Sequence, residues 1–236
     1  MRRYLLSKGE PQQRLCLTFS RGEELKYITH LDIMRLWQRA LRRAGMPLSY
    51  SQGFSPHPKI AIAAPLALGV TSEGELMDVF LERRVSTDFF IKVVGEELPQ
   101  GIEILGIKEL WPKLPSLQSQ LRFAEYRVEV ESIRKPKEVK QALHSLLAKE
   151  SLPWQHARDK EIRNYDLRAL IDDLWPIDWS DSKHTLGMRL RTDESGSGRP
   201  EQVVLALEFT EPPKSIHRTK LILGTNPHGR LPTNES

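Results

Sequence analysis

The sequence predicts an α+β protein made of two tandem ferredoxin-like units of the βαββαβ type, each built on an antiparallel sheet. Two observations support this class. Residues 15–110 alternate between strand-like and helix-like hydrophobic periodicity in the order β-α-β-β-α-β, and residues 123–209 repeat much of that plan. A chain of 236 residues is long enough to bury an apolar core in each unit.

The first half contains the clearest elements. A strand is expected over 15–21 and a helix over 29–44, where apolar residues recur at helical spacing. Thr29 followed three residues later by Asp32 is a capping-box pattern, and Gly45 marks the end of the helix. Further elements are expected as strands over 59–63, 75–82 and 101–110 and as a helix over 86–98.

Pro112 and Pro115 interrupt this pattern and predict a boundary between the two halves. We therefore expect a first domain over 1–112, a second domain over 117–224 and a mobile tail over 225–236. The elements expected in the second domain are strands over 123–131, 154–163 and 184–191, helices over 136–149 and 166–174, a hairpin turn over 196–198 and a closing strand over 203–209.

Composition limits the chemistry that this chain can perform alone. Cys16 is the only cysteine, which excludes intrachain disulfides and cysteine-ligated zinc or iron-sulfur sites. The histidines show no metal-ligand spacing, so we expect no metal site and no cofactor bound by this chain. No apolar run approaches the roughly 18 residues of a membrane helix, and the N-terminus lacks the apolar core of a signal peptide. We therefore expect a cytoplasmic protein without a membrane partner.

Positive charge is concentrated at the beginning of the chain. Residues 1–60 hold 11 Lys and Arg against 4 Asp and Glu, whereas residues 61–120 hold 5 against 9. The surplus coincides with the helix over 29–44 and the loop that follows it. An anionic partner is therefore expected, such as RNA, a nucleotide or an acidic protein surface.

The candidate binding residues lie on that helix and in that loop. Guanidinium groups donate in a planar fork that suits phosphate, and an exposed aromatic ring can stack on a base. The residues expected to bind the ligand are Arg35, Arg39, Arg42 and Arg43 on the helix and Gly53, Phe54, His57 and Lys59 in the loop. The alternatives are a solvated basic face and a turn whose Phe54 packs into the core.

Four short motifs give the chain a resemblance to a known family. They are I-T-H-L-D-x-x-R from Ile28, R-A-x-R-R-A-G from Arg39, Y-S-x-G-F-S-P-H-P-K from Tyr50 and A-P-L-x-x-G from Ala64. With them the chain resembles the bacterial radical-SAM-associated (radical-SAM-linked) family, a domain of unknown function, densely over 15–75 and more thinly to 209.

The resemblance implies an accessory role beside a cobalamin-binding radical SAM protein, with RNA as the expected substrate. That partner would itself use S-adenosylmethionine, an iron-sulfur cluster and cobalamin. A radical SAM cluster needs three cysteine ligands, and this chain has one cysteine. The resemblance therefore implies a partner of the enzyme and not the enzyme itself.

The sequence favours a noncatalytic accessory module that binds RNA or another phosphate-bearing ligand. One alternative is an RNA-processing or RNA-modifying enzyme, because metal-free RNA cleavage needs a general base and a general acid. His30, Tyr50 and His57 are the candidate catalytic residues for that alternative. Another alternative is a module that contacts only protein and has no ligand site.

Overall fold

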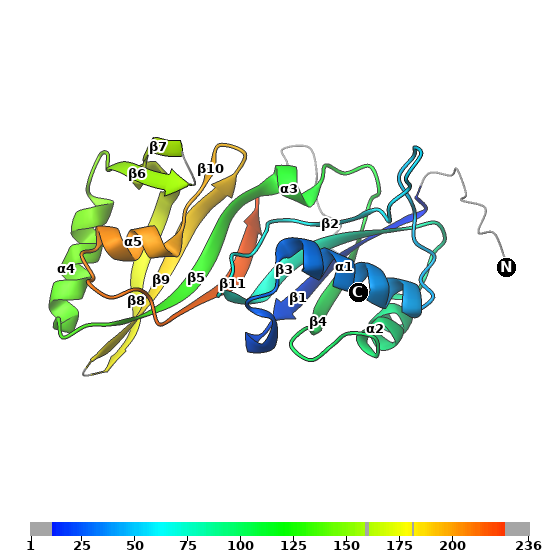
Figure 1. Ribbon diagram of the computed structural model, residues 1–236, viewed down its shortest axis with the longest axis horizontal. Helices are drawn as coiled ribbons and strands as arrows, with labels where there is room; N and C mark the ends of the chain where they lie inside the picture. The colour runs from blue at the N-terminus through cyan, green and yellow to red at the C-terminus, as the bar shows by residue number, and fades with distance from the viewer. Residues whose placement is uncertain (1–10, 159–160, 181, 225–236) are drawn as a thin grey trace, which may run out of the picture.

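The computed structural model describes residues 11–158, 161–180 and 182–224 (Figure 1). The tail expected over 225–236 lies outside the described residues. Helices combined with a mostly antiparallel sheet confirm the α+β class. Within the described ranges, no helix is long and apolar enough to cross a bilayer.

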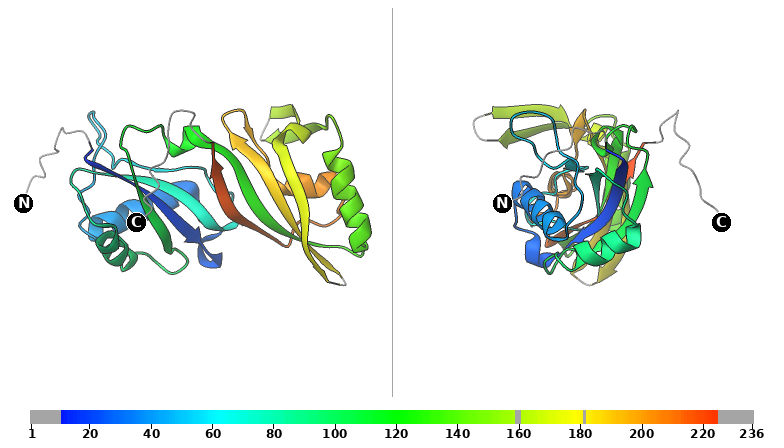
Figure 2. Two further views of the ribbon diagram at one scale, coloured as in Figure 1. Left: turned by 180° about the vertical axis from the view of Figure 1, so that it is seen from behind. Right: turned by 90° about the vertical axis from the view of Figure 1, so that its right-hand side faces the viewer.

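The first half follows the expected order of elements. Its strands are β1 (Gln13–Arg21), β2 (Ile60–Ile62), β3 (Thr71–Leu81) and β4 (Ile104–Leu110). Its helical elements are η1 (Glu23–Leu25), α1 (His30–Arg43) and α2 (Thr87–Gly95). The strands lie in the order β4-β1-β3-β2. Both α-helices lie in front of these strands in Figure 1 and behind them in the reverse view of Figure 2, so they cover the same face.

Side-chain caps explain where the two helices begin. The Thr29 hydroxyl accepts a hydrogen bond from the Asp32 N–H at 3.3 Å and donates to the Asp32 carboxylate at 2.7 Å. This contact confirms Thr29 as the predicted N-cap and satisfies a backbone donor that the first helical turn leaves free. Ser86 caps α2 in the same way, because its hydroxyl accepts from the Phe89 N–H at 3.3 Å.

The second half repeats the strand order of the first. Its main strands are β5 (Leu121–Glu131), β8 (Ile171–Ser180), β9 (Lys183–Asp193) and β11 (Ser215–Leu223). They lie in the order β8-β9-β5-β11, which corresponds to second, third, first and fourth, as in the first half. The remaining elements are α3 (Leu117–Gln120), α4 (Pro136–Leu147), the separate hairpin β6 (Pro153–Arg158) and β7 (Glu161–Asp166), η2 (Arg168–Leu170), β10 (Gly196–Ser197) and α5 (Pro200–Ala206).

The prediction of a closing strand over 203–209 is wrong, because most of that segment belongs to the helix α5. Pro200 lies in the first turn of this helix, where its missing N–H leaves no hydrogen bond unmade. Val203, Val204 and Leu207 are buried at helical spacing. The strand that closes the second half is β11, further along the chain.

Two other expectations in the second half are corrected. The helix expected over 166–174 is reduced to the short turn η2, since Ile171 already begins β8. Asp166 precedes the N-cap Leu167, and its carboxylate accepts from the Leu152 N–H at 2.7 Å and from the Arg168 N–H at 2.9 Å. The single strand expected over 154–163 is the hairpin of β6 and β7.

One continuous sheet joins the two halves, so the expectation of two separate antiparallel sheets is corrected. Its strand order is β10-β9-β5-β11-β3-β1-β4. The junction is the contact between β11 and β3, where the strands run parallel and pair Arg218 with Ser72. The Ser72 hydroxyl also donates to the Arg218 carbonyl at 2.9 Å. The last strand of the second half thus extends the sheet of the first.

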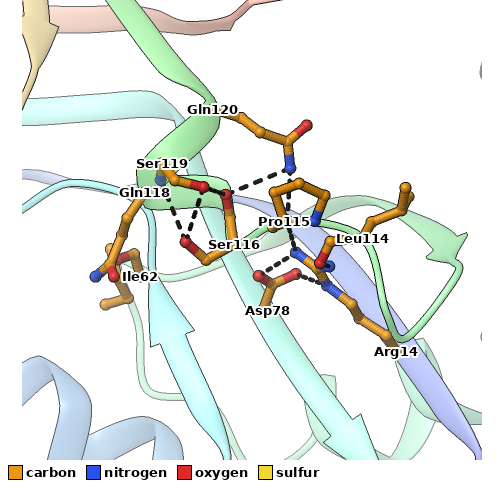
Figure 3. Close-up of polar contacts among 9 residues, drawn as sticks. All are labelled: Arg14, Ile62, Asp78, Leu114, Pro115, Ser116, Gln118, Ser119 and Gln120. Atoms are coloured by element: carbon orange, nitrogen blue, oxygen red, sulfur yellow. Dashed lines mark hydrogen bonds and ion pairs between the residues drawn. The ribbon is translucent and has the colours of Figure 1, made fainter. Parts of the chain in front are cut away.

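The segment between β4 and α3 is fastened to the sheet by a buried arginine (Figure 3). Arg14 of β1 donates to both carboxylate oxygens of Asp78, at 2.8 and 2.7 Å. The same guanidinium donates to the carbonyls of Leu114 and Pro115, at 2.7 and 3.0 Å. The proline-rich segment that the sequence marks as a boundary is therefore held against β1 and β3.

Candidate nucleic-acid interface

The buried stripe of α1 determines which way its arginines point. Trp37 is 0% exposed and meets Phe19 of β1 edge-to-face, with 5.0 Å between the ring centroids. Because this side of the helix is fixed on the sheet, the opposite side faces outward. That outward side carries four exposed residues, Arg35, Arg39, Arg42 and Arg43.

The stretch of sequence around these arginines is free of acidic residues. No Asp or Glu occurs between Asp32 and Glu73. The same stretch contains the four arginines of α1 and Lys59. Apart from Asp32 in the first turn of α1, only carboxylates that the fold brings in from other segments can therefore weaken the positive field of this surface.

Two of the arginines face the acidic end of α2. Arg39 and Arg43 line a shallow depression together with Glu96 and Glu97. Arg43 lies 3.9 Å from the Glu97 carboxylate. Exposed ion pairs of this kind contribute about 0–1 kcal/mol to the stability of the fold. Their carboxylates nevertheless lower the local positive potential. This side of the basic face is thus partly neutralised.

The other side of the basic face is more open. Arg42 forms no ion pair with any residue in the described part of the chain. Arg35 pairs with Asp32 at 3.0 Å, and both side chains are exposed, so a phosphate can replace the carboxylate at small cost. At roughly 100° per residue these two arginines lie within roughly 20° of one another around the helix. They are the arginines best placed to bind an anion.

The loop after α1 is a hairpin held at its base by the end of β3. The Ser49 N–H donates to the Phe80 carbonyl at 2.8 Å, and the Phe80 N–H donates to the Lys59 carbonyl at 3.1 Å. Further out, the Ser51 N–H donates to the His57 carbonyl at 2.9 Å. The His57 N–H in turn donates to the Ser51 hydroxyl oxygen at 3.0 Å. These bonds close the hairpin and leave residues 52–56 as its tip.

The tip of this hairpin presents an aromatic ring to solvent. Phe54 is 110% exposed, which excludes the alternative in which its ring packs into the core. Gly53 has φ +127°, a conformation that L-residues rarely adopt, and a Cβ there would have nothing within 4 Å. Glycine is therefore needed for the shape of the backbone and not for packing. His57 is also exposed, and Lys59 is half-buried beside the base of the hairpin.

The end of α1 and the hairpin lie at the same end of the first half. Leu48, shortly after the last turn of α1, pairs with Leu81 at the end of β3. The hairpin begins there, at the hydrogen bonds to Phe80. The structure therefore brings Arg42 and the tip residues Gly53 and Phe54 toward one end, while Arg35 lies nearer the start of the helix.

His30 lies at the opposite end of α1, beside buried charges. Arg21 is 2% exposed and donates to the carbonyls of Leu25 and Ile28, which fixes the turn before the helix. Burial first, and then the positive charge of Arg21, lower the pKa of the His30 imidazole. His30 is therefore neutral at pH 7 and half-buried.

The structure does not bring the candidate catalytic histidines together. Arg21, beside His30, pairs with Ser72 near the start of β3, whereas the hairpin with His57 leaves from Phe80 near its end. A strand rises about 3.3 Å per residue, so these points are about 25 Å apart. Tyr50, which is half-buried, bridges to Pro58 in the base of the hairpin and lies on the side of His57.

Sequence reasoning missed a second buried ion pair near His30. Arg218 of β11 donates to the Glu75 carboxylate at 2.8 and 2.5 Å, and both side chains are nearly inaccessible to solvent. Arg218 also donates to the carbonyls of Ala64 and Pro65, at 3.2 and 3.3 Å, which fixes the loop after β2. No local pattern in the sequence signals this pair, because its two residues lie 143 positions apart.

The described residues contain no group of three or more His, Cys, Asp or Glu that could hold a metal ion. Cys16 is buried among apolar side chains and lies on the strand that carries Arg14. Burial, followed by the negative charge of Asp78, raises the pKa of its thiol to about 11.

The Cys16 thiol is expected to be unreactive in the folded protein. With this raised pKa and little access to solvent, reaction with Ellman's reagent at pH 8 should be slower by about 100-fold or more than in the urea-unfolded chain. The absorbance of the released thiolate measures both rates, and Cys16→Ser provides the blank. Similar rates in buffer and in urea would show that the thiol is accessible.

These features define an α+β protein with an exposed basic helix and an aromatic-tipped hairpin at one end of a long sheet. A family model described as "Uncharacterized protein conserved in bacteria (DUF2344)" matches residues 14–200. Because this match covers most of the chain, the protein belongs to that family. The comparison with curated proteins found no match.

Matches among solved structures were also found. One is described as "Crystal Structure of a Cbf5-Nop10-Gar1 Complex", with 9% identity and a TM-score of 0.49, over 89% of this chain and 48% of that chain. Another, "Structure of H/ACA RNP bound to a substrate RNA containing 2'-deoxyuridine", has 10% identity and a TM-score of 0.44, over 88% and 47%. This chain thus spans about half the length of those chains, and similarity at this level carries no conclusion about function.

Proposed function

We propose that this protein is a noncatalytic module that binds RNA or another phosphate-bearing ligand through α1 and the hairpin after it. The observation that carries the proposal is the fully exposed Phe54, on a hairpin tip beside a helix whose outward face is basic. Arg35, Arg42 and Lys59 supply cations for phosphate, and the ring supplies a surface for a base. The acid-free stretch from Ile33 to Ser72 keeps the potential of this surface positive.

The placement of the histidines favours this binding role over an RNA-processing enzyme. An enzyme of that kind needs a base and an acid on either side of one phosphodiester. Arg21, beside His30, pairs with the start of β3, whereas the hairpin with His57 is bonded to its other end, about 25 Å away along the strand. Binding requires no such pairing, so the geometry supports a module without its own catalytic centre.

The proposed setting of this module is a complex with a cobalamin-binding radical SAM protein that acts on RNA in the cytoplasm. The support is the resemblance of the four motifs between Ile28 and Gly69. Purification of the tagged chain from a bacterial extract, with and without nuclease, tests the partnership. Retention of a radical SAM protein after nuclease treatment would support it, and its consistent absence would count against it.

We further infer that the described parts of the two expected domains, 1–112 and 117–224, are two ferredoxin-like units that share one sheet. The support is the shared strand order of the two halves, β2-β3-β1-β4 and β8-β9-β5-β11, together with the helices that cover the sheet. The binding surface would then belong to the first unit alone.

Reversing charge on the outward face of α1 is expected to weaken RNA binding. Arg35→Glu/Arg42→Glu should lower the affinity for a labelled oligoribonucleotide by about 10–100-fold at low salt, because it places carboxylates where phosphates bind. Fluorescence anisotropy at several salt concentrations measures the affinity, and the slope of log K against log salt should become flatter in the variant.

The matched control for this pair is Lys140→Glu, a charge reversal on the exposed side of α4 in the other half. It should change the affinity less than about threefold, because it lies outside the proposed surface. An equal loss in the control would point to general charge attraction, and an absence of RNA binding by the unmodified protein would overturn the proposed function.

A further inference from the structure

The hairpin over 50–59 differs from three other connections of the chain in how it is held. Buried arginines hold the carbonyls of those connections: Arg21 holds Leu25, Arg14 holds Leu114, and Arg218 holds Ala64. The hairpin is instead tied by backbone bonds at its base and by the contact of Ser51 with His57. Its tip thus projects from a fixed base without being packed onto the body of the protein.

An exposed ring at this tip leaves a large apolar surface in water. Covering a phenylalanine side chain typically stabilises a protein by about 1.5–3 kcal/mol, and no described residue covers Phe54. Gly53, directly before Phe54, adopts a positive φ that turns the chain at this position. The hairpin therefore presents the ring outward by its backbone shape.

The surroundings of the ring indicate what can cover it. The other exposed residues of the tip are Gln52, Gly53 and Ser55, none of which has an apolar side chain, and Pro56 is half-buried. A protein partner that buried this tip would need a wider apolar patch to form a stable contact. A single exposed ring, on a hairpin that also carries His57 and Lys59, matches the flat face of one nucleobase attached to a phosphate backbone.

A base inside a duplex does not offer this face, because both of its faces are stacked on neighbouring bases. Only an unpaired base can slide onto an aromatic ring without disrupting a duplex. We propose that Phe54 stacks on an unpaired base, and that the ligand of this surface is a single-stranded segment of RNA. The inference rests on the proposed function and specifies its ligand: the phosphates bind Lys59 and the arginines of α1, and the base binds the hairpin.

The test compares one unstructured oligoribonucleotide of about a dozen nucleotides with its own duplex, by fluorescence anisotropy with the full chain. The single strand is expected to bind at least tenfold more tightly than the duplex. Phe54→Ala should lower the affinity for the single strand by about tenfold or more, and change duplex binding less than twofold. Phe54→Trp should retain the preference, since its ring also stacks.

Two further readouts separate stacking from other effects. The salt dependence should be unchanged in Phe54→Ala, because stacking releases no counterions, whereas arginine variants should flatten it. Ile133→Ala removes a side chain that is also almost fully exposed, at 95%, from the second half, and should leave binding unaltered. Since Phe54 makes no packing contact, its variants should unfold at the same urea concentration as the unmodified protein.

Each outcome supports or overturns a specific statement. Absence of binding to either form of RNA overturns the proposed function itself. Equal binding of single strand and duplex, or an affinity that Phe54→Ala leaves intact, overturns the stacking inference but not RNA binding. Equally tight binding of a mononucleotide would identify a free nucleotide as the ligand. RNA binding that survives Phe54→Ala, together with loss of a protein captured by the unmodified chain, would identify the tip as a protein contact.

Discussion

Replacing Asp78 with alanine is expected to lower the free energy of unfolding by about 3–5 kcal/mol, because it leaves the buried Arg14 guanidinium without its counter-charge. Asp78 is 1% exposed and Arg14 is 0% exposed. Arg14 also donates to the carbonyls of Leu114 and Pro115, so it cannot turn toward water without releasing the segment between the halves (Figure 3). Urea unfolding followed by circular dichroism measures the loss.

Strand β3 offers a matched control for this variant. Glu73 pairs with Arg127 at 3.5 Å, but these side chains are 52% and 46% exposed, so Glu73→Ala should cost less than about 1 kcal/mol. The double variant Arg14→Met/Asp78→Leu should recover much of the loss, because it removes both charges from the core. If Asp78→Ala cost no more than Glu73→Ala, the Arg14–Asp78 pair would have to be solvated.

The second large effect is expected at the junction of the two halves. A Cβ at Gly74 would lie 2.5 Å from the Thr219 carbonyl oxygen and 2.8 Å from the Lys220 Cα, both in the backbone of β11. Because neither atom belongs to a flexible side chain, β11 must move away from β3 to admit the methyl group. Gly74→Ala should therefore lower the free energy of unfolding by about 3 kcal/mol, measured by the same urea titration.

Gly106 of β4 provides the comparison for Gly74. A Cβ there meets nothing within 4 Å, and Gly106 does not require a positive φ. Gly106→Ala should change the stability by less than about 1 kcal/mol and could increase it, since alanine restricts the unfolded chain. Equal stability of the two variants would mean that the contact between β11 and β3 tolerates an added methyl group, and that the junction is looser than the structure indicates.

Local features of the first half could be predicted because they depend on neighbours in the sequence. The cap at Thr29, the buried stripe of α1 and the order of elements in the first half all follow from short-range spacing, and the structure confirms them. The segment over 203–209 was misassigned because its apolar residues fit both periods. The helix forms there because it buries both Val203 and Val204, and it packs against β5.

The sequence by itself determined the α+β class and the basic outward face of α1, because each depends on residue type and local spacing. The structure decided that the loop after α1 is a hairpin with an exposed Phe54. Only the tertiary structure decided that one sheet joins the halves and that Glu96 and Glu97 reach Arg39 and Arg43. It also decided that Arg21, beside His30, pairs with the start of β3, whereas the hairpin with His57 is bonded to its end. The physical reason is distance along the chain: the ion pairs that hold β1, β3 and β11 join residues 64 and 143 positions apart, and no local pattern encodes such contacts.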